Sequence, residues 1–206
     1  MNRAPLIKIC GIGCIEDALV AKDAGADAIG LVHHPKSPRH IDLEESRDII
    51  KQLPTHIEAI HVCVDHDAEE IKKFESRWVQ LHGKETAEDV SRIRTITEKR
   101  IIRGFTFSEE SCRAWDTHPD VDVLLLDGDA AGSGETFDHS MLADLIPTLR
   151  TPIIIAGGLN PDNVGDLLQK VHPFGVDVSS GVEHTRGQKD HGLIRAFCDA
   201  IRSSRH

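Results

Sequence analysis

Residues 152–181 read PIIIAGGLNPDNVGDLLQKVHPFGVDVSSG. This stretch begins with an apolar run that ends in paired glycines, and it ends with a second short β-branched run at residues 175–180. Between the two runs, apolar residues recur at the spacing of one helix face. A helix between two neighbouring strands favours a parallel pair. Parallel strands need a long crossover connection, whereas antiparallel strands can be joined by a short hairpin. The stretch therefore predicts a strand–helix–strand unit.

The same alternation of short β-branched runs and helical spacing fills the 206-residue chain. A strand followed each time by a helix favours a sheet of parallel strands. We expect strands at residues 6–12, 28–32, 57–64, 78–81, 100–105, 121–127, 152–158 and 175–180, and helices near residues 15–24, 42–52, 66–75, 85–97, 109–115, 139–149, 161–170 and 189–203.

Eight strand–helix units fit either a closed barrel or an open doubly wound sheet. The count of eight, the lack of a GxGxxG motif after the first strand and the polar residues at the strand ends favour closure. We therefore predict an α/β fold, a single (β/α)₈ TIM barrel with a closed parallel eight-stranded sheet, in which residues 1–206 form one domain. Barrels of this kind usually span about 200 to 400 residues, so the loops must be short.

Strand parity predicts which side chains face the barrel axis. In the first and last strands the β-branched residues share one face, and Lys8 and Asp177 lie on the other. Side chains alternate between the faces of a strand, and the apolar face should meet the helices. We therefore expect Lys8 and Asp177 to pair inside the barrel, where the last strand neighbours the first. The same reasoning turns Gln80, Arg103 and Asp127 inward.

Composition limits the classes of partner and compartment. The formal net charge of −10 argues against nucleic acid or an anionic membrane as the main partner. No apolar run approaches the ~20 residues that span a bilayer, and residues 1–12 lack a signal-peptide pattern. Five cysteines without CxxC spacing fit reduced thiols better than a disulfide framework. We expect a cytoplasmic monomer or homodimer.

The loops after the last two predicted strands carry the clearest chemical signal. Gly157 and Gly158 allow backbone N–H groups to approach an anion, and the helix that follows them favours negative charge at its N-terminus. Ser179, Ser180 and Gly181 offer further donors. These two loops form the usual phosphate site of an eightfold barrel, although two tight turns would look the same. We therefore predict a small phosphorylated substrate.

Cys10 and Asp127 end the first and sixth predicted strands. A thiol acts as a general base once part of it is thiolate, and nearby cations lower its pKa. A carboxylate across the pocket acts as a general acid if desolvation raises its pKa. Such a pair suits an aldose–ketose type isomerisation. Taken singly, Cys10 also reads as an inert buried thiol and Asp127 as a structural ion-pair partner.

Seven blocks, taken in order, resemble one family over nearly the whole chain. They are KICGI at 8–12, PKSPR at 35–39, QLHG at 80–83, LLD at 125–127, GSG at 132–134 with TFD at 136–138, GGLNP at 157–161 and VDVSSGVE at 176–183. Their order and spacing are similar to those of the phosphoribosylanthranilate isomerases of tryptophan biosynthesis. Any one block alone would be a weak signal.

The resemblance implies an isomerase that converts N-(5-phosphoribosyl)anthranilate to 1-(2-carboxyphenylamino)-1-deoxyribulose 5-phosphate by an Amadori rearrangement. It implies that Asp127 protonates the furanose ring oxygen and that Cys10, as thiolate, removes the C2′ proton. It assigns the anthranilate carboxylate to Arg39, whose guanidinium suits a bidentate pair. It implies no metal and no organic cofactor. The alternative for Arg39 is a surface ion pair.

The chain departs from the family at several positions on the rim of the expected pocket. Gly13 stands where the family usually has Thr, and His33 and His34 stand where it has aromatic residues. Glu135 and His139 replace the usual Lys and Trp in and after the sixth loop. A lost cation and lost aromatics would weaken anthranilate binding. The identity of the substrate is therefore the open question of the sequence.

Two other functions stay open at this point. His33, His61, Asp65 and His82 fall near the ends of strands two to four, where they could hold a divalent metal for the isomerisation or epimerisation of another sugar phosphate. A phosphate-binding barrel without catalysis is the second alternative, and it would make Cys10 or Asp127 dispensable.

Overall fold

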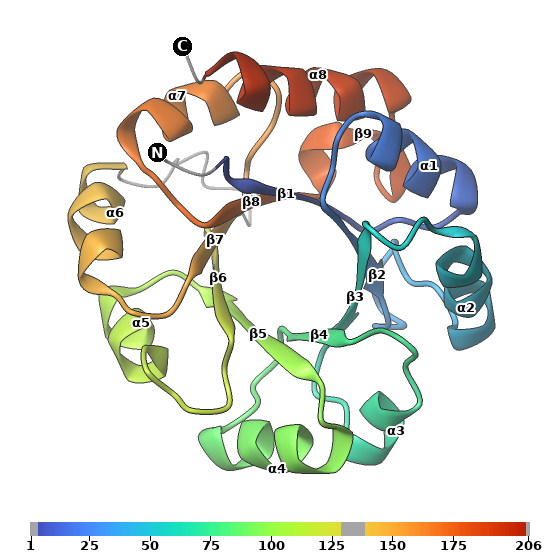
Figure 1. The fold of residues 1–206 in the computed structure, drawn as a ribbon, viewed down its shortest axis with the longest axis vertical. Coiled ribbons are helices and arrows are strands. Elements are labelled where there is room, and N and C mark those ends of the chain that lie inside the picture. The colour runs from blue at the N-terminus through green and yellow to red at the C-terminus, as the bar shows by residue number, and fades with distance from the viewer. Residues whose placement is uncertain (1–3, 129–138, 205–206) are drawn as a thin grey trace.

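Eight parallel strands form a closed ring with helices around it (Figure 1). The computed structural model describes residues 4–128 and 139–204. The strands follow one another around the ring in chain order, and β8 pairs with β1. The predicted (β/α)₈ barrel is confirmed.

Each predicted strand and helix has a counterpart in the structure, although several begin later or end earlier than predicted. The ring consists of β1 (Leu6–Cys10), β2 (Ala28–Val32), β3 (Glu58–Cys63), β4 (Trp78–Leu81), β5 (Arg100–Thr106), β6 (Val123–Asp127), β7 (Ile153–Ala156) and β8 (Gly175–Val178). The helices are α1 (Ile15–Asp23), α2 (Leu43–Gln52), α3 (Ala68–Lys72), α4 (Ala87–Thr97), α5 (Glu109–Trp115), α6 (His139–Leu145), α7 (Val164–Lys170) and α8 (His191–Ser203), with 3₁₀ turns η1 (Ile146–Thr148) and η2 (Ser180–Val182).

A hairpin between β8 and α8 has no counterpart among the predicted elements. It consists of β9 (Glu183–Thr185) and β10 (Gln188–Lys189), which pair antiparallel outside the ring of strands (Figure 1). Gly187 turns the chain with φ of 87°, a backbone conformation that glycine adopts at low cost. The prediction of a helix from residue 189 was therefore wrong by two residues, and α8 begins at His191.

Three consecutive helices each begin at a residue whose side chain caps the helix N-terminus. Asp42, Thr86 and Asp67 each accept a hydrogen bond from the backbone three residues on, and an acidic side chain at that position bonds back to the cap. Such a capping box satisfies two backbone donors that have no partner within the helix. The sequence therefore specifies where α2, α3 and α4 begin.

Apolar side chains form two separate layers. One fills the space between the ring and the helices. The other lies inside the ring and contains Ala28, Ile60, Ile102, Val123, Leu125, Ile154 and Ala156. Above the inner layer, Lys8 and Asp177 stand directly opposite each other in the β1–β8 register, and Lys8 Nζ lies 2.9 Å from Asp177 Oδ1. The predicted buried ion pair is confirmed.

The Arg103 side chain points away from the barrel axis, and not toward it as predicted. Its neighbour Ile102 packs in the inner layer, whereas the Arg103 guanidinium lies 5.0 Å from the Trp115 ring centroid and 3.1 Å from Glu85 Oε2. The prediction failed because Ile101 and Ile102 are adjacent and of equal hydrophobicity, so β5 has no clear apolar face. Arg103 thus belongs to the layer between strands and helices.

No helix of the described ranges has both the length and the apolar character needed to cross a membrane. The five cysteines are free, and four of them are buried.

Candidate active site

Cys10 and Asp127 end β1 and β6 on the same rim of the barrel, because all eight strands are parallel. The strands β7 and β8 separate them around the ring. Cys10 is 7% exposed, and the Asp127 side chain is half-buried at the mouth. The structure therefore brings the predicted base and acid to the same rim of the barrel, on strands that are not neighbours.

Burial, and not the neighbouring cations, dominates the pKa of Cys10. Burial raises the pKa of the thiol, while the charges of Lys8 and Lys189 act to lower it. Gly30 on β2 leaves room for the sulfur, because a Cβ there would lie 2.6 Å from Cys10 Sγ. The cations near Cys10 therefore act in the expected direction, but burial outweighs them, so the pKa of the thiol lies above its ordinary value.

A histidine adjoins Asp127, and the predicted site residues did not include it. His82 Nε2 lies 3.5 Å from Asp127 Oδ2, and its Nδ1 lies 2.9 Å from the amide nitrogen of the buried Gln80. Because that amide nitrogen donates, Nδ1 accepts, and Nε2 carries the hydrogen that faces Asp127. The QLHG block was the available signal for His82.

The two glycines after β7 have left-handed backbone. Gly157 and Gly158 have φ of 85° and 67°. A Cβ on Gly157 would lie 2.5 Å from Asp127 Oδ1, whereas one on Gly158 would meet no atom within 4 Å among the described residues. Gly157 therefore makes room for Asp127, and no atom of the described residues occupies the space beside Gly158.

The loops after β7 and β8 lie against each other. A Cβ on Gly181 would collide with the carbonyl oxygen of Leu159. Asn160 and Asn163 exchange hydrogen bonds between side chain and backbone, which holds the loop after the glycines. This loop delays the helix, so α7 begins at Val164 and not near residue 161 as predicted. Ser179 and Ser180 follow β8 directly at the same rim.

Arg39 reaches the rim from the loop between β2 and α2, and it is held by an acidic side chain that the sequence did not single out. Its Nε and Nη2 donate to the two carboxylate oxygens of Glu183, at 2.6 and 2.8 Å. The Arg39 stem crosses Gly11, where a Cβ would lie 2.5 Å from Arg39 Cδ. Arg39 therefore lies beside Cys10, and its ion pair is partly buried and not at the surface.

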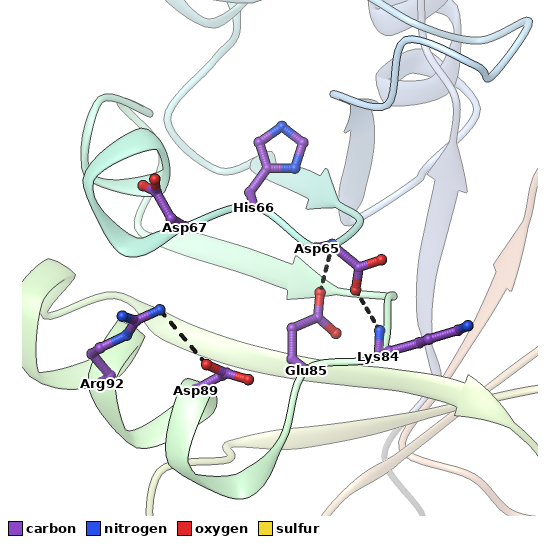
Figure 2. Close-up of a pocket in the computed structure, with 7 residues that line it drawn as sticks. All are labelled: Asp65, His66, Asp67, Lys84, Glu85, Asp89 and Arg92. Atoms are coloured by element: carbon purple, nitrogen blue, oxygen red, sulfur yellow. Dashed lines mark hydrogen bonds and ion pairs between the residues drawn. The ribbon is translucent and has the colours of Figure 1, made fainter.

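A pocket of about 180 Å³ opens outside the ends of β3 and β4 (Figure 2). Its carboxylates hold loops. Asp65 accepts from the backbone of Lys84, and Glu85 accepts from the backbone N–H groups of Asp65 and Gly83. The buried Glu85 also pairs with Arg103. The carboxylates of Asp65 and Glu85 therefore already bind backbone N–H groups of the two loops.

The geometry agrees with the comparisons to known proteins. The family model described as N-(5'phosphoribosyl)anthranilate (PRA) isomerase matches residues 7–200. The chain belongs to this isomerase family. An N-(5'-phosphoribosyl)anthranilate isomerase from Pseudomonas aeruginosa strain LESB58 is 40% identical over 210 residues, which cover 97% of this chain and 96% of that protein.

Solved structures of the family have the same fold. The phosphoribosyl anthranilate isomerase from Thermotoga maritima matches with a TM-score of 0.87 and 36% identity, over 97% of this chain and 99% of that one. A phosphoribosyl anthranilate isomerase in complex with reduced 1-(o-carboxyphenylamino)-1-deoxyribulose 5-phosphate matches with a TM-score of 0.85 and 35% identity, with the same two coverages. The likeness therefore extends over essentially the whole barrel.

The structure separates His82 from His33 and His61, the other two histidines that were considered as metal ligands. His33 Nε2 lies 2.6 Å from His61 Nδ1, and both rings stack on Phe74 in the layer between strands and helices. His82 lies instead at the mouth, beside Asp127. No three histidine, cysteine or acidic side chains in the described part of the chain converge as metal ligands. His33, one of the departures from the family, therefore packs against His61 and Phe74.

The other departures from the family lie at the rim or outside the described residues. Gly13 is exposed, and a Cβ there would meet no atom within 4 Å in the described ranges. His34 is half-buried. Glu135 lies outside the described residues, as does the side chain of His139.

Proposed function

We propose that this chain acts as an N-(5'-phosphoribosyl)anthranilate isomerase through the residues that meet at the mouth of the barrel. The protein is an isomerase that converts N-(5-phosphoribosyl)anthranilate to 1-(2-carboxyphenylamino)-1-deoxyribulose 5-phosphate, a step of tryptophan biosynthesis. The observation that carries the assignment of roles is the placement of a thiol and a carboxylic acid at the same rim of the barrel, on strands that are not neighbours.

The reaction begins with two proton transfers on two parts of one sugar. Asp127, in its acid form, donates a proton to the furanose ring oxygen, the C1′–O bond breaks, and the nitrogen lone pair forms a C1′=N bond. Cys10, as thiolate, then takes the C2′ proton, which leaves an enolamine. The enolamine becomes the ketone as its hydroxyl loses a proton and C1′ gains one. Position-specific acid–base catalysis of this kind needs no further group.

The substrate carries an anionic group at each end, and we assign each group to a different part of the site. We assign the phosphate to the loops after β7 and β8, with backbone and hydroxyl donors from Gly157, Gly158, Ser179, Ser180 and Gly181. We assign the anthranilate carboxylate to Arg39, whose guanidinium suits a bidentate pair. The open space at Gly158 and the position of Arg39 beside Gly11 support these assignments.

Turnover of N-(5-phosphoribosyl)anthranilate, generated in situ, by the purified protein tests the assignment. We expect activity that a strong metal chelator does not reduce. Activity that disappears with chelator and returns with a divalent cation would favour the metal-dependent alternative. Absence of turnover together with binding of inorganic phosphate would favour a phosphate-binding barrel without catalysis.

We further propose a cytoplasmic enzyme whose partner is a small phosphorylated molecule, with neither nucleic acid nor a membrane involved. The net charge of −10 and the free cysteines support this proposal. Both a monomer and a homodimer fit, and sedimentation of the full chain distinguishes them.

A further inference from the structure

The hairpin β9–β10 carries two buried charges that the proposed mechanism does not use. The Glu183 side chain is 4% exposed and the Lys189 side chain 0%. Lys189 Nζ lies 2.9 Å from Glu183 Oε1, and Arg39 contacts both oxygens of the same carboxylate. We call Glu183, Lys189 and Arg39 the hairpin clamp.

The carboxylate of the clamp is fully occupied by protein donors. Glu183 Oε1 accepts from Arg39 and Lys189, and Oε2 accepts from Arg39 and from the backbone N–H of Gly187 at 3.1 Å. Four accepted bonds use the approximately four lone-pair positions of a carboxylate. Burial acts to raise the pKa of Glu183, but these donors lower it to about 2. Glu183 is therefore charged and has no position left for substrate.

Arg39, in contrast, keeps donors free. A guanidinium has five N–H groups, and Glu183 takes one from Nε and one from Nη2. No other side chain among the described residues accepts from Nη1 of Arg39. The remaining edge, made of Nη1 and Nη2, is a planar fork that matches a second carboxylate. Because Glu183 fixes one edge of a rigid plane, it also fixes the direction of the other edge.

The hairpin contacts both ends of the proposed substrate site. Lys189 Nζ donates to the carbonyl oxygen of Ser179 at 2.9 Å, next to the proposed phosphate loop. The turn at Gly187 packs on the loop that carries Arg39, since a Cβ there would lie 2.5 Å from the carbonyl oxygen of Pro38. One hairpin therefore joins the carboxylate end of the site to its phosphate end.

We propose that the hairpin clamp determines substrate specificity: Glu183 and Lys189 are positioning residues that orient the free edge of Arg39, so that the enzyme prefers N-aryl ribosylamine phosphates with a carboxylate ortho to the nitrogen. This inference rests on the proposed role of Arg39. Without Glu183, Arg39 and Lys189 are two close cations that repel each other, and the free edge of Arg39 loses its direction.

The test compares two competitive inhibitors, reduced 1-(o-carboxyphenylamino)-1-deoxyribulose 5-phosphate and its phenyl counterpart without the carboxylate. In Glu183→Gln, an amide donor faces the donors of Arg39 and Gly187. We expect the preference for the carboxylate compound to fall at least tenfold, with the affinity for the phenyl compound almost unchanged. The KM for N-(5-phosphoribosyl)anthranilate should rise about tenfold, while kcat changes less than threefold.

Two further variants separate positioning from general damage. Gly187→Ala removes no charge, but it pushes the turn against Pro38, and it should lower the same preference. Glu109→Gln is the matched control, because Glu109 also accepts two bonds from one arginine but lies exposed on α5. It should leave both affinities unchanged.

Arg39→Met distinguishes failure of this inference from failure of the proposed role of Arg39. If Arg39→Met lowers the preference and Glu183→Gln does not, Arg39 binds the carboxylate without the clamp, and this inference is wrong. If Arg39→Met leaves the preference unchanged, the role of Arg39 is itself wrong. Equal loss of both affinities in Glu183→Gln, with a lower melting temperature, would show that the clamp is merely structural. In the double variant Arg39→Met, Glu183→Gln, the loss of preference for the carboxylate compound should be smaller than the sum of the two single losses, because Arg39 and Glu183 act as one unit.

Discussion

Two sides of the barrel use buried charges differently. Near the ends of β8, β1 and β2, Lys8 and Lys189 lie close to Cys10, inside the ring or at its mouth. Near the ends of β3, β4 and β5, Glu85 and Arg103 pair outside the ring, between strands and helices. We call these the thiol side and the anchor side. Both contain buried ion pairs, but only the thiol side contributes residues to the proposed active site.

The difference between the two sides follows from which way a strand side chain points. Lys8 and Asp177 lie on the inward positions of their strands, directly beneath Cys10. Arg103 lies one position out of phase, and it donates to the backbone carbonyl oxygens of Leu81 and Gly83. A charge that faces inward can act on the reacting group, whereas one that faces outward can only hold loops. Substitutions should therefore affect catalysis on one side and stability on the other.

The largest effect should come from removing the base or the acid. We expect Cys10→Ala and Asp127→Asn each to lower kcat by roughly 10² to 10⁴-fold, the usual contribution of positioned acid–base groups. Affinity for inorganic phosphate should change little. Steady-state kinetics and phosphate inhibition measure both quantities, and Cys14→Ala and Asp48→Asn are the controls. Near-normal turnover in either variant would remove that residue from the mechanism.

On the anchor side we expect a loss of stability instead. Arg103→Met leaves the buried Glu85 without its partner, which typically costs about 3–5 kcal/mol of unfolding free energy. The double variant Arg103→Met, Glu85→Gln should recover part of that loss, because no charge is left unpaired. Urea unfolding measures the stabilities. A strong fall in kcat of the folded single variant would contradict the division between the two sides.

Acid should destabilise the fold through the two buried histidines that stack on Phe74. Burial lowers the pKa of His33 to about 4 and that of His61 to about 3, below the ordinary 6.5. As pH falls below 6.5, the unfolded chain binds protons that the folded chain does not, so the free energy of unfolding falls down to about pH 3–4. Each histidine contributes ~1.4 kcal/mol per pH unit in this range.

Unfolding at a series of pH values checks that slope. The double variant His33→Phe, His61→Phe should flatten it, since Phe74 can stack on aromatic rings of either kind. His56→Gln, at an exposed position, should leave the slope as it is. An unchanged slope in the double variant would mean that other groups cause the acid sensitivity.

The smallest effect concerns the pH profile of the thiol side. Because burial raises the pKa of Cys10, the thiolate fraction increases as the medium becomes alkaline, and kcat/KM should rise with pH above neutrality. In Cys10→Asp the base is already ionised at neutral pH, so this alkaline rise should disappear from whatever activity remains. Measurement of kcat/KM against pH, for the unmodified protein and for Cys10→Asp, tests this expectation. An alkaline rise that persists in Cys10→Asp would assign it to another group.

Local patterns in the sequence determined most of the barrel. Alternating β-branched runs specified the eight strands, and parity placed Lys8 opposite Asp177 because both strands have one clearly apolar face. The rim position of Cys10 and Asp127 followed as well, since each lies at the end of an apolar run. These features depend only on side-chain alternation and parallel pairing, which residues close in sequence encode.

Only the tertiary structure decided which distant residues act together. Strand β5 has adjacent isoleucines, so packing against Trp115 and Glu85 determined the side on which Arg103 lies. Glu183 is 144 positions from Arg39, and no spacing rule predicts that the two meet. The raised pKa of Cys10 likewise depends on the burial of the thiol in the folded barrel. Strand parity predicted the long-range Lys8–Asp177 pair because both residues lie on strands, but it carries no information on burial or on a contact between a loop and a hairpin, which exist only once the ring has closed.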